Sequence, residues 1–362
     1  AAGVVAALKR LDPSLIVEGV GGPRMAAAGA TIHQETTTKA AMSLHAIKRV
    51  LEIRRLEAWL RNRYRSADKP DLHICVDSSG FNLRFAKLAR EAGVKTLYFV
   101  APQLWASRAG RIKLMRAYVD RLACIFPFEA EWFGSRGVKT TFVGHPLFDQ
   151  LPENRLDRVP AARFPDRPLV IGVVAGSRRS EVRENFPPLL EVMKLIRGKY
   201  PDARFLIPTT PAGDAIVRSF FPSQSENHAV IKQDAFDELI PQCDLVLCKS
   251  GTSTVHVAAY GVPMIVVYRI NTVLWQALGR WLIKTPKIAM VNILAGNVEL
   301  VPEFIPWNGD AAPVADRALD LLANPQKLTE MRQNLLKLIE PMDHRGASEN
   351  VAKIAIEMLH EK

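Results

Sequence analysis

The sequence Lys-Ser-Gly-Thr-Ser-Thr-Val-His-Val-Ala-Ala-Tyr-Gly-Val, residues 249–262, decides the fold, because it sets a turn of small residues between two apolar runs. The run 243–248 predicts a buried strand, and 263–268 predicts the next parallel strand. Between them, Ser250-Gly251-Thr252 predicts a turn that opens a helix, so free backbone N–H groups and the positive helix end would face an anion such as a diphosphate. The alternative is that Gly251 merely closes a tight strand-to-helix turn.

Strand-like runs alternate with helical stretches along the whole chain, which is typical of an α/β fold with parallel sheets. The first series of expected strands comprises residues 15–20, 72–77, 96–101, 121–126 and 141–144. The second series comprises residues 169–175, 204–208, 229–232, 244–248 and 263–268. Two Rossmann-like, doubly wound domains follow from the two series. Because ligands of such sheets bind beyond the carboxyl ends of the strands, we expect the site in a cleft between the domains.

The domain boundary is expected in residues 151–167, which are rich in Pro, Arg and Asp, lack periodicity and therefore indicate a linker. The first domain then spans 1–150 and the second 168–344. The chain after Pro313 is expected to be helical to its end. Its closing helix, within 345–362, could pack across either domain, and we place it on the first.

Composition limits the partners. Among 362 residues, 48 Lys and Arg outnumber 37 Asp and Glu to give a net charge of +11, which favours nucleic acid, an anionic membrane surface or a phosphorylated substrate. No nucleic-acid motif with interleaved stacking aromatics is present, so we expect no nucleic-acid partner. The four cysteines lack metal-site spacing and predict reduced core thiols of a cytosolic protein.

The chain ends and hydropathy give two further expectations. No run of 18 apolar residues occurs, so the protein is expected to be soluble or peripheral on a membrane. The sequence begins at Ala1 without an initiator Met or a signal peptide, and we expect its natural start to be missing.

A second polar turn follows the expected strand 169–175. In Gly176-Ser177-Arg178-Arg179, backbone amides, a hydroxyl and a guanidinium converge at the start of a helix, where an anion could bind. Alternatively, Arg178 could simply pair with Glu181 or Glu184 on the helix surface. The two turns together favour a phosphate site more than either turn alone.

The first domain carries polar turns of its own. Asp77 follows a strand and places a carboxylate at the mouth of the sheet, or else only caps the next helix. Residues 100–111 follow another strand, and Arg108 and Arg111 add positive charge there, although such a basic helix is more often a solvated face. The stretch 44–64 predicts an amphipathic helix that lies on an anionic bilayer, or an ordinary packing helix with a basic outer face.

In this order, the motifs of the chain resemble the lipid-A-disaccharide synthase family, which consists of inverting glycosyltransferases of GT-B architecture. The resemblance covers almost the whole chain. It is carried by Gly21-Gly22-Pro23-Arg24-Met25 with Ala28-Gly29, Val76-Asp77 with Phe81-Asn82, Pro102 with Trp105, Arg108, Gly110 and Arg111, Pro127-Phe128-Glu129, Phe142-Val143-Gly144-His145-Pro146, Gly176-Ser177-Arg178 with Glu181, Lys249-Ser250-Gly251-Thr252, Gly261-Val262-Pro263-Met264 with Tyr268-Arg269, and Asn292-Ile293-Leu294-Ala295.

The resemblance implies a reaction and a location. Such enzymes join UDP-2,3-diacylglucosamine to 2,3-diacylglucosamine 1-phosphate (lipid X), forming a β-1,6 disaccharide and releasing UDP, peripherally at the cytoplasmic face of the inner membrane. The family implies no metal and no cofactor; Arg178, Arg269 and the amides around Gly251 could neutralise the leaving diphosphate instead.

The resemblance also implies site residues. UDP would contact Gly176, Ser177, Arg178, Ser250, Gly251, Thr252, His256, Arg269 and Asn292. The acceptor and its lipid would lie against Asn82, Trp105, Arg108 and Arg111. The catalytic residues would be Asp77 as general base and Arg178 on the leaving group.

The chain departs from the family pattern at several acids. The family usually has Asp at the position of Gly80, Glu at that of His256, and Gly and Glu at those of Ser43 and Ala46. Asp77 is therefore the first candidate for the base and His45 a weaker one, while His256 could bind ribose hydroxyls or be a core histidine. Two other functions stay open: another GT-B enzyme acting on UDP-sugars, such as an epimerase or a peptidoglycan-type transferase, and a non-catalytic UDP-sugar or lipid binder.

Overall fold

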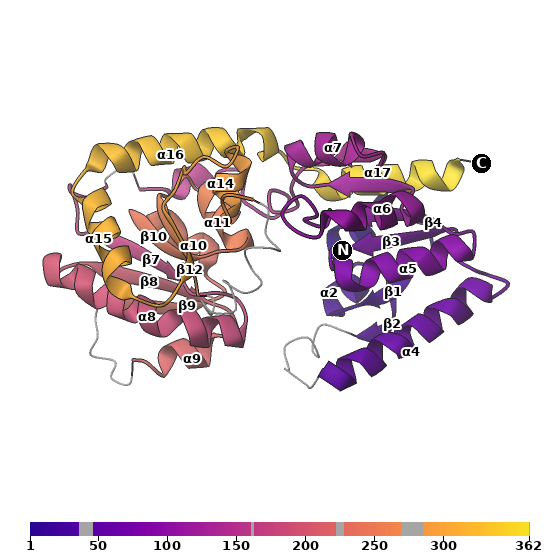
Figure 1. Cartoon of the computed structure of the whole chain (residues 1–362), viewed down its shortest axis with the longest axis horizontal. Helices are drawn as coiled ribbons and strands as arrows, with labels where there is room; N and C mark the ends of the chain where they lie inside the picture. The colour runs from indigo at the N-terminus through magenta and orange to yellow at the C-terminus, as the bar shows by residue number, and fades with distance from the viewer. Residues whose placement is uncertain (36–45, 161–162, 222–227, 270–284, 362) are drawn as a thin grey trace. The chain divides into compact units, whose positions relative to one another are not determined.

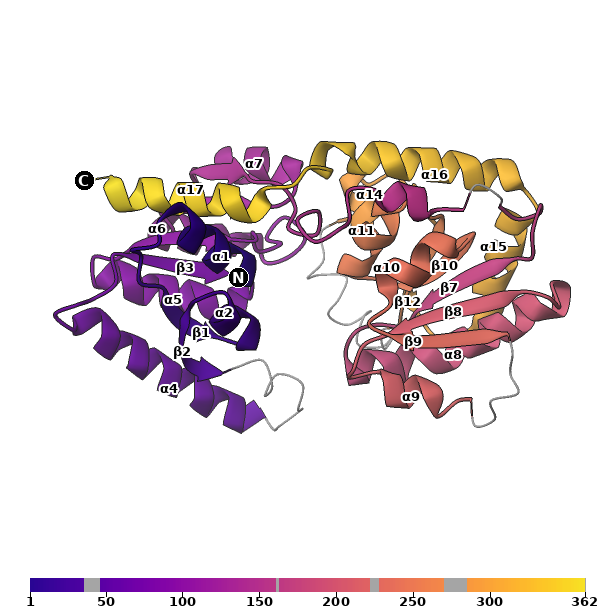
Figure 2. The same cartoon turned by 180° about the vertical axis from the view of Figure 1, so that it is seen from behind.

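The computed structural model describes residues 1–35, 46–160, 163–221, 228–269 and 285–361, so the positions of Ser43 and His45 lie outside the described residues. The chain forms an α/β fold with parallel sheets, as the sequence predicted, and divides into two compact units (Figures 1 and 2). Unit 1 comprises Ala1–Gln150 and Met342–Lys362, and unit 2 comprises Leu151–Pro341.

Unit 2 contains a six-stranded parallel sheet whose order is β12-β11-β10-β7-β8-β9. The strands are β7 (Val170–Val174), β8 (Arg204–Thr209), β9 (Ala229–Gln233), β10 (Leu245–Lys249), β11 (Met264–Arg269) and β12 (Glu303–Trp307). Counted along the chain, this is the 3-2-1-4-5-6 order of a Rossmann fold, and the order reverses between β7 and β10. Ligands of such sheets bind at this switch point, beyond the carboxyl ends of the two strands.

Helices cover both faces of this sheet (Figure 1). On one face, α8 (Arg179–Lys199) packs against α9 (Asp214–Arg218) and α15 (Ala311–Leu322). On the other, α11 (Thr252–Ala259) packs against α14 (Met290–Leu294) and α16 (Pro325–Ile339), near α10 (Phe236–Leu239) and η3 (Ile240–Gln242). Burial on both faces explains why β10 has an unbroken apolar run instead of an alternating pattern.

Two strands were not predicted, and a third begins later than expected. The edge strand β12 contains Pro306, which a central strand would not tolerate, so its sequence does not resemble the other strands. Strand β2 (Thr31–Glu35) pairs only with β1 (Glu18–Gly21) and has no buried residue. The strand expected at residues 15–20 begins at Glu18 because Ile16 is 88% exposed.

Unit 1 has a second parallel sheet of four strands in the order β3-β4-β5-β6. These are β3 (Leu72–Val76), β4 (Lys95–Phe99), β5 (Arg121–Cys124) and β6 (Thr140–Phe142). Its helices are α1 (Ala2–Leu11), α2 (Pro23–Ala27), α4 (Ala46–Arg65), α5 (Ser79–Glu91), α6 (Ile112–Tyr118), which follows η1 (Ala109–Arg111), and α7 (Pro127–Gly134). Every expected strand of the first series has a counterpart here or in β1.

The closing helix α17 (Ala347–His360), which follows η5 (Glu340–Met342), belongs to unit 1, where it packs along α1 and onto β3 and β4. Asp149 caps it: its carboxylate accepts N–H groups of Gly346, Ala347 and Ser348 at 2.8, 3.1 and 2.9 Å. Asp149, near the end of the first segment of unit 1, thus fixes the start of α17 in the second segment.

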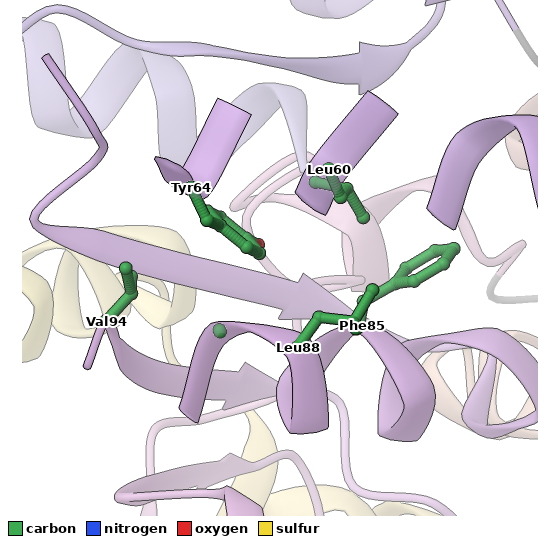
Figure 3. Close-up of a cluster of buried hydrophobic side chains, with 6 residues drawn as sticks. Leu60, Tyr64, Phe85, Leu88 and Val94 are labelled. Atoms are coloured by element: carbon green, nitrogen blue, oxygen red, sulfur yellow. The ribbon is translucent and has the colours of Figure 1, made fainter. Parts of the chain in front are cut away.

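Helix α4 packs into unit 1 with the apolar side chains of its second half. Leu60 is 7% and Tyr64 4% exposed, and Figure 3 shows them beside Phe85 and Leu88 of α5. Leu56 and Trp59 are half-buried against the same cluster, which favours the packing-helix interpretation for these side chains. Among the described residues, no helix is long and apolar enough to cross a membrane.

The described residues of the expected linker, 151–160 and 163–167, pack onto unit 2. They include η2 (Arg155–Arg158), and the buried Arg155 donates through Nε to the carbonyl of Ala259 at 2.8 Å. Arg167 donates to the carboxylate of Asp244 at 3.0 Å. The segment is therefore fastened to the body of unit 2 by charged side chains.

Candidate active site

The turn after β7 is built around Gly176. Its φ of +125° is a conformation that L side chains rarely adopt, and a Cβ there would lie 2.7 Å from the Cβ of Glu181. The carboxylate of Glu181 folds back under the turn, where Oε2 accepts the backbone N–H groups of Ser177 and Arg178 at 3.1 and 3.3 Å. The turn thus places its main-chain donors at the N-terminus of α8.

The turn after β10 lies beside it. Strands β7 and β10 are parallel neighbours with Val174 opposite Cys248, so the turns that follow leave the sheet at the same edge. Gly251 caps α11 with a φ of +159°, a conformation that L side chains rarely adopt, and Thr252 begins the helix. Lys249 links the turns, because its Nζ lies 3.1 Å from Oε1 of Glu181. Gly176-Ser177-Arg178 and Ser250-Gly251-Thr252 therefore meet at the switch point.

Two guanidinium groups reach this edge. The side chain of Arg178 is 79% exposed and pairs with Oε1 of Glu181 at 3.0 Å, which is the surface pairing weighed as an alternative from the sequence. Arg269 ends β11; its N–H donates to Oδ1 of the buried Asn185 at 3.0 Å, and its guanidinium donates to the carbonyl of Glu184 at 3.1 Å. Both arginines thus contact the first turns of α8.

His256 lies in the second turn of α11 and is oriented by a carboxylate. Its Nε2 is 2.6 Å from Oδ1 of Asp237, the ring of Phe236 stacks on it at 4.2 Å, and the Tyr260 hydroxyl donates to the same oxygen at 2.8 Å. The hydrogen bond with His256 lowers the pKa of Asp237, although burial opposes it. The imidazole therefore sits next to an ionised carboxylate, on the helix that begins at the second turn.

Asn292 does not present its amide to a ligand. It is fully buried in α14, where its Nδ2 donates to the carbonyl of Val301 and to Glu303, both at 2.9 Å. Its Oδ1 accepts the N–H groups of Leu300 and Val301, also at 2.9 Å. The expected contact with UDP is therefore not supported, and the residue instead holds the loop that leads into β12.

In unit 1, Asp77 stands at the carboxyl end of β3 on strained backbone. Asp77, Ser78 and Val100 have φ of +54°, +43° and +65°, a region that is costly for a β-branched residue such as valine. Asn82 donates through Nδ2 to the carbonyls of Asp77 at 2.6 Å and Val76 at 2.9 Å. The side chain of Asp77 is exposed, and among the described side chains none caps the first turn of α5.

Trp105 is buried instead of lining a surface. It is 8% exposed, its ring meets Phe128 edge-on at 5.1 Å, and its Nε1 donates to Oε1 of Glu129 at 3.0 Å. The other oxygen of Glu129 accepts the N–H groups of Ile125 and Phe126. Burial raises the pKa of Glu129 to about 7, against the effect of these three donors. Trp105 therefore supports the loop after β4 from within unit 1, and its contact with the acceptor stays a prediction.

Arg108 and Arg111 follow that loop. Arg108 is exposed with a φ of +58°, and Arg111 is half-buried at the end of η1. Within the described parts of the chain, neither guanidinium forms an ion pair. They leave uncompensated positive charge on unit 1.

Four residues emerge from the structure with roles that the sequence analysis did not assign. Lys249 and Glu129 belong to quoted motifs but were given no task, Glu181 was considered only as a surface partner of Arg178, and Asp237 was not considered. One signal was available for Lys249 and Glu129, since each is a charge that directly follows an apolar run, residues 245–248 and 122–128 respectively. Asp237 gave no such signal, because its partner His256 is 19 residues away.

The fold and the two turns define a class: the chain is a GT-B-type α/β protein with two Rossmann-like units. A solved structure, S. aureus MnaA with UDP, superimposes with a TM-score of 0.63 at 13% identity, covering 100% of this chain and 94% of that one, which shows the shared fold. The chain belongs to the lipid-A-disaccharide synthetase family, whose model matches residues 1–357.

Curated relatives agree with this assignment. A lipid-A-disaccharide synthase of Geobacter metallireducens is 36% identical over 358 residues, which cover 98% of this chain and 92% of the relative. One of Geobacter sulfurreducens is 35% identical over 363 residues, covering 99% and 93%. The chain is thus a glycosyltransferase of lipid A disaccharide synthesis, as its resemblance implied.

Proposed function

We propose that the chain transfers 2,3-diacylglucosamine from its UDP derivative to the 6-hydroxyl of lipid X with inversion, and that the diphosphate of UDP lies on the two turns of unit 2. The observation that carries this proposal is the position of both turns at the switch point between β7 and β10, where Lys249 and Glu181 join them. UDP-sugar and lipid X are the substrates that the family implies.

The donors at this edge suit a leaving diphosphate. The N-termini of α8 and α11 bring main-chain N–H groups and partial positive charge to one place. The guanidinium groups of Arg178 and Arg269 add two full charges, which can form bidentate hydrogen bonds with phosphate oxygens. As the sugar departs, negative charge grows on the diphosphate, and these donors stabilise it.

The nucleoside end of UDP would lie toward His256. Its imidazole can hydrogen-bond a ribose hydroxyl, and Asp237 holds the ring and supplies a second oxygen nearby. Because the family usually has Glu at this position, the pair formed by His256 and Asp237 takes over that carboxylate function in our proposal.

The acceptor hydroxyl would lose its proton to Asp77. This carboxylate is exposed at the carboxyl end of β3, and such a base must come within hydrogen-bond reach of the hydroxyl or act through one water. Arg108 and Arg111 would attract the phosphate of lipid X. Asn82 acts indirectly by fixing the main chain of Asp77.

We further propose that the protein works as a peripheral protein on the inner face of the inner membrane. Its substrates carry acyl chains, and its net charge of +11 favours an anionic surface. Exposed Arg54, Arg55 and Arg61 of α4 provide a basic face on unit 1.

The test is to incubate the protein with UDP-2,3-diacylglucosamine and lipid X and to measure UDP release together with disaccharide formation. Stoichiometric formation of both supports the transferase. Conversion of a UDP-sugar without acceptor would favour an epimerase instead. Saturable UDP binding without any product would favour a non-catalytic binder. This alternative needs a test because Gly80 stands where the family usually has Asp.

A further inference from the structure

Lys249 is a cation with little access to water, at the centre of the unit 2 site. Its side chain is 12% exposed, its Nζ lies 3.1 Å from Oε1 of Glu181 and 4.6 Å from the ring centroid of Tyr268. Glu181 is also only 12% exposed. A charge in such surroundings is costly unless it is paired, so the position of Lys249 is specified by its partners.

The carboxylate of Glu181 engages the same donors that we assign to the diphosphate. Oε2 accepts the N–H groups of Ser177 and Arg178, and Oε1 is shared by the guanidinium of Arg178 and the ammonium of Lys249. Burial alone would raise the pKa of Glu181, but the hydrogen bond and charge of Lys249, with the two N–H groups, hold it below its ordinary value. Glu181 is therefore an internal anion beside the proposed site.

The charge of Glu181 determines whether Arg178 can leave it to bind the diphosphate. If Arg178 were the sole cation on Glu181, turning toward a diphosphate would leave a sparsely hydrated carboxylate unpaired beside a second anion. With Lys249 on the same oxygen, the charge of Glu181 stays balanced when Arg178 leaves. Arg178 is the movable partner, since its side chain is 79% exposed while that of Lys249 is 12% exposed.

We propose that Lys249 is a positioning residue for the diphosphate: it holds the charge of Glu181 and thereby makes Arg178 available to the ligand. The inference rests on the proposed function, because it assumes that UDP binds at these turns. Lys249 acts through Glu181 and Arg178, and its removal is harmful only while Glu181 carries its charge.

The experiment measures UDP affinity by calorimetry for the whole chain and four variants. Lys249→Met removes the ammonium at similar length and is expected to weaken UDP binding about tenfold, a typical coupling between neighbouring charges. Lys249→Met combined with Glu181→Gln removes both charges and is expected to bind UDP within about threefold of the wild type, since a neutral amide no longer retains Arg178. Glu181→Gln alone completes the double-mutant cycle.

The control is Lys194→Met, because Lys194 forms a surface pair with Glu191 on the same helix α8, at 2.8 Å, and should leave affinity unchanged. Thermal melts check that each variant is folded. If Lys249→Met does not fold, the charge-neutral double variant still shows whether UDP binds without the ammonium of Lys249 once Glu181 is uncharged.

The outcomes separate the two proposals. Weak binding by Lys249→Met and recovery in the double variant support the inference. If the double variant folds but binds as weakly as Lys249→Met, or if Lys249→Met binds like the wild type, the inference is wrong while UDP binding at the turns stands. Absence of UDP binding by the wild type would overturn the proposed function and this inference together.

Discussion

The hydroxyl of Tyr98 donates a 2.7 Å hydrogen bond to the main-chain carbonyl of Asp77. Asn82 donates to the same carbonyl at 2.6 Å, and the N–H of Asp77 donates to the carbonyl of Phe99 at 2.9 Å. Three contacts therefore hold Asp77 in a left-handed conformation that is uncommon for residues other than glycine. They fix the main chain and leave the carboxylate exposed at the carboxyl edge of the sheet.

Asp77→Asn tests this carboxylate as the general base. The variant keeps the shape and the main-chain contacts, so UDP affinity should be unchanged while kcat falls about 10²- to 10⁴-fold, the usual range for general base catalysis. Steady-state kinetics and UDP titration measure the two quantities. Equal losses in kcat and affinity would instead indicate a structural role.

Arg178→Ala tests the leaving-group charge. Because the side chain is 79% exposed, the melting temperature should stay the same, whereas kcat should fall about 10²-fold or more when one preorganised donor is lost. Arg183→Ala, at an exposed position on the same helix, is the matched control and should retain full activity. Wild-type turnover by Arg178→Ala would show that Arg178 does not act on the leaving group.

Gly176→Ala tests the turn after β7. The alanine would have to keep a φ of +125°, and its Cβ would lie 2.7 Å from the Cβ of Glu181. We therefore expect a destabilisation of about 1–3 kcal/mol together with weaker UDP binding. Gly198→Ala, within α8 and with open space around it, should instead raise the melting temperature slightly. Thermal unfolding compares the two, and similar effects of both substitutions would contradict the strained turn.

Glu129→Gln tests the buried carboxyl under Trp105 through pH. Burial raises its pKa to about 7 from 4.5, so between these values the native state binds more protons than the unfolded chain, and stability is lost as pH rises through this window. The variant is neutral throughout, so the advantage of the wild type should shrink by up to about 3 kcal/mol from pH 4.5 to 8.

Melting temperatures across that pH range measure this difference. Glu131→Gln, at an exposed position of the same helix α7, is the control and should show no such trend. A difference between the wild type and Glu129→Gln that is independent of pH would contradict the raised pKa.

His256→Ala tests the ribose contact. Loss of one hydrogen bond should weaken UDP binding about tenfold or less, with little effect on inorganic pyrophosphate, which has no ribose. Competition titrations with both ligands make the comparison. An equal loss of affinity for UDP and for pyrophosphate would indicate that His256 supports the structure of α11 and does not contact the nucleoside.

The sequence predicted the parts of this molecule that depend on local pattern. Strand β10 and its turn were recognisable because an apolar run ends at Ser250-Gly251-Thr252, and the same holds for β7 and Gly176. The edge strand β12 was missed because Pro306 interrupts its pattern. The alternation of strands and helices was enough for the α/β class.

The site was harder to predict from the sequence than the fold, because it depends on the directions of side chains and on the order of the strands. Asn292 and Trp105 belong to the family motifs, but nothing in their neighbours shows that one is fully buried and the other bonded to Glu129. The bridge from Lys249 to Glu181 joins residues 68 apart and exists only because β7 and β10 are neighbours. Such contacts follow from the three-dimensional order of the strands.

A crystal structure of the protein with UDP tests the central claim most directly. The account predicts diphosphate oxygens within hydrogen-bond distance of main-chain N–H groups in both Gly176-Ser177-Arg178 and Ser250-Gly251-Thr252, with Arg178 turned from Glu181 onto the ligand. A diphosphate bound elsewhere, or held by one turn while Arg178 stays paired with Glu181, would contradict it.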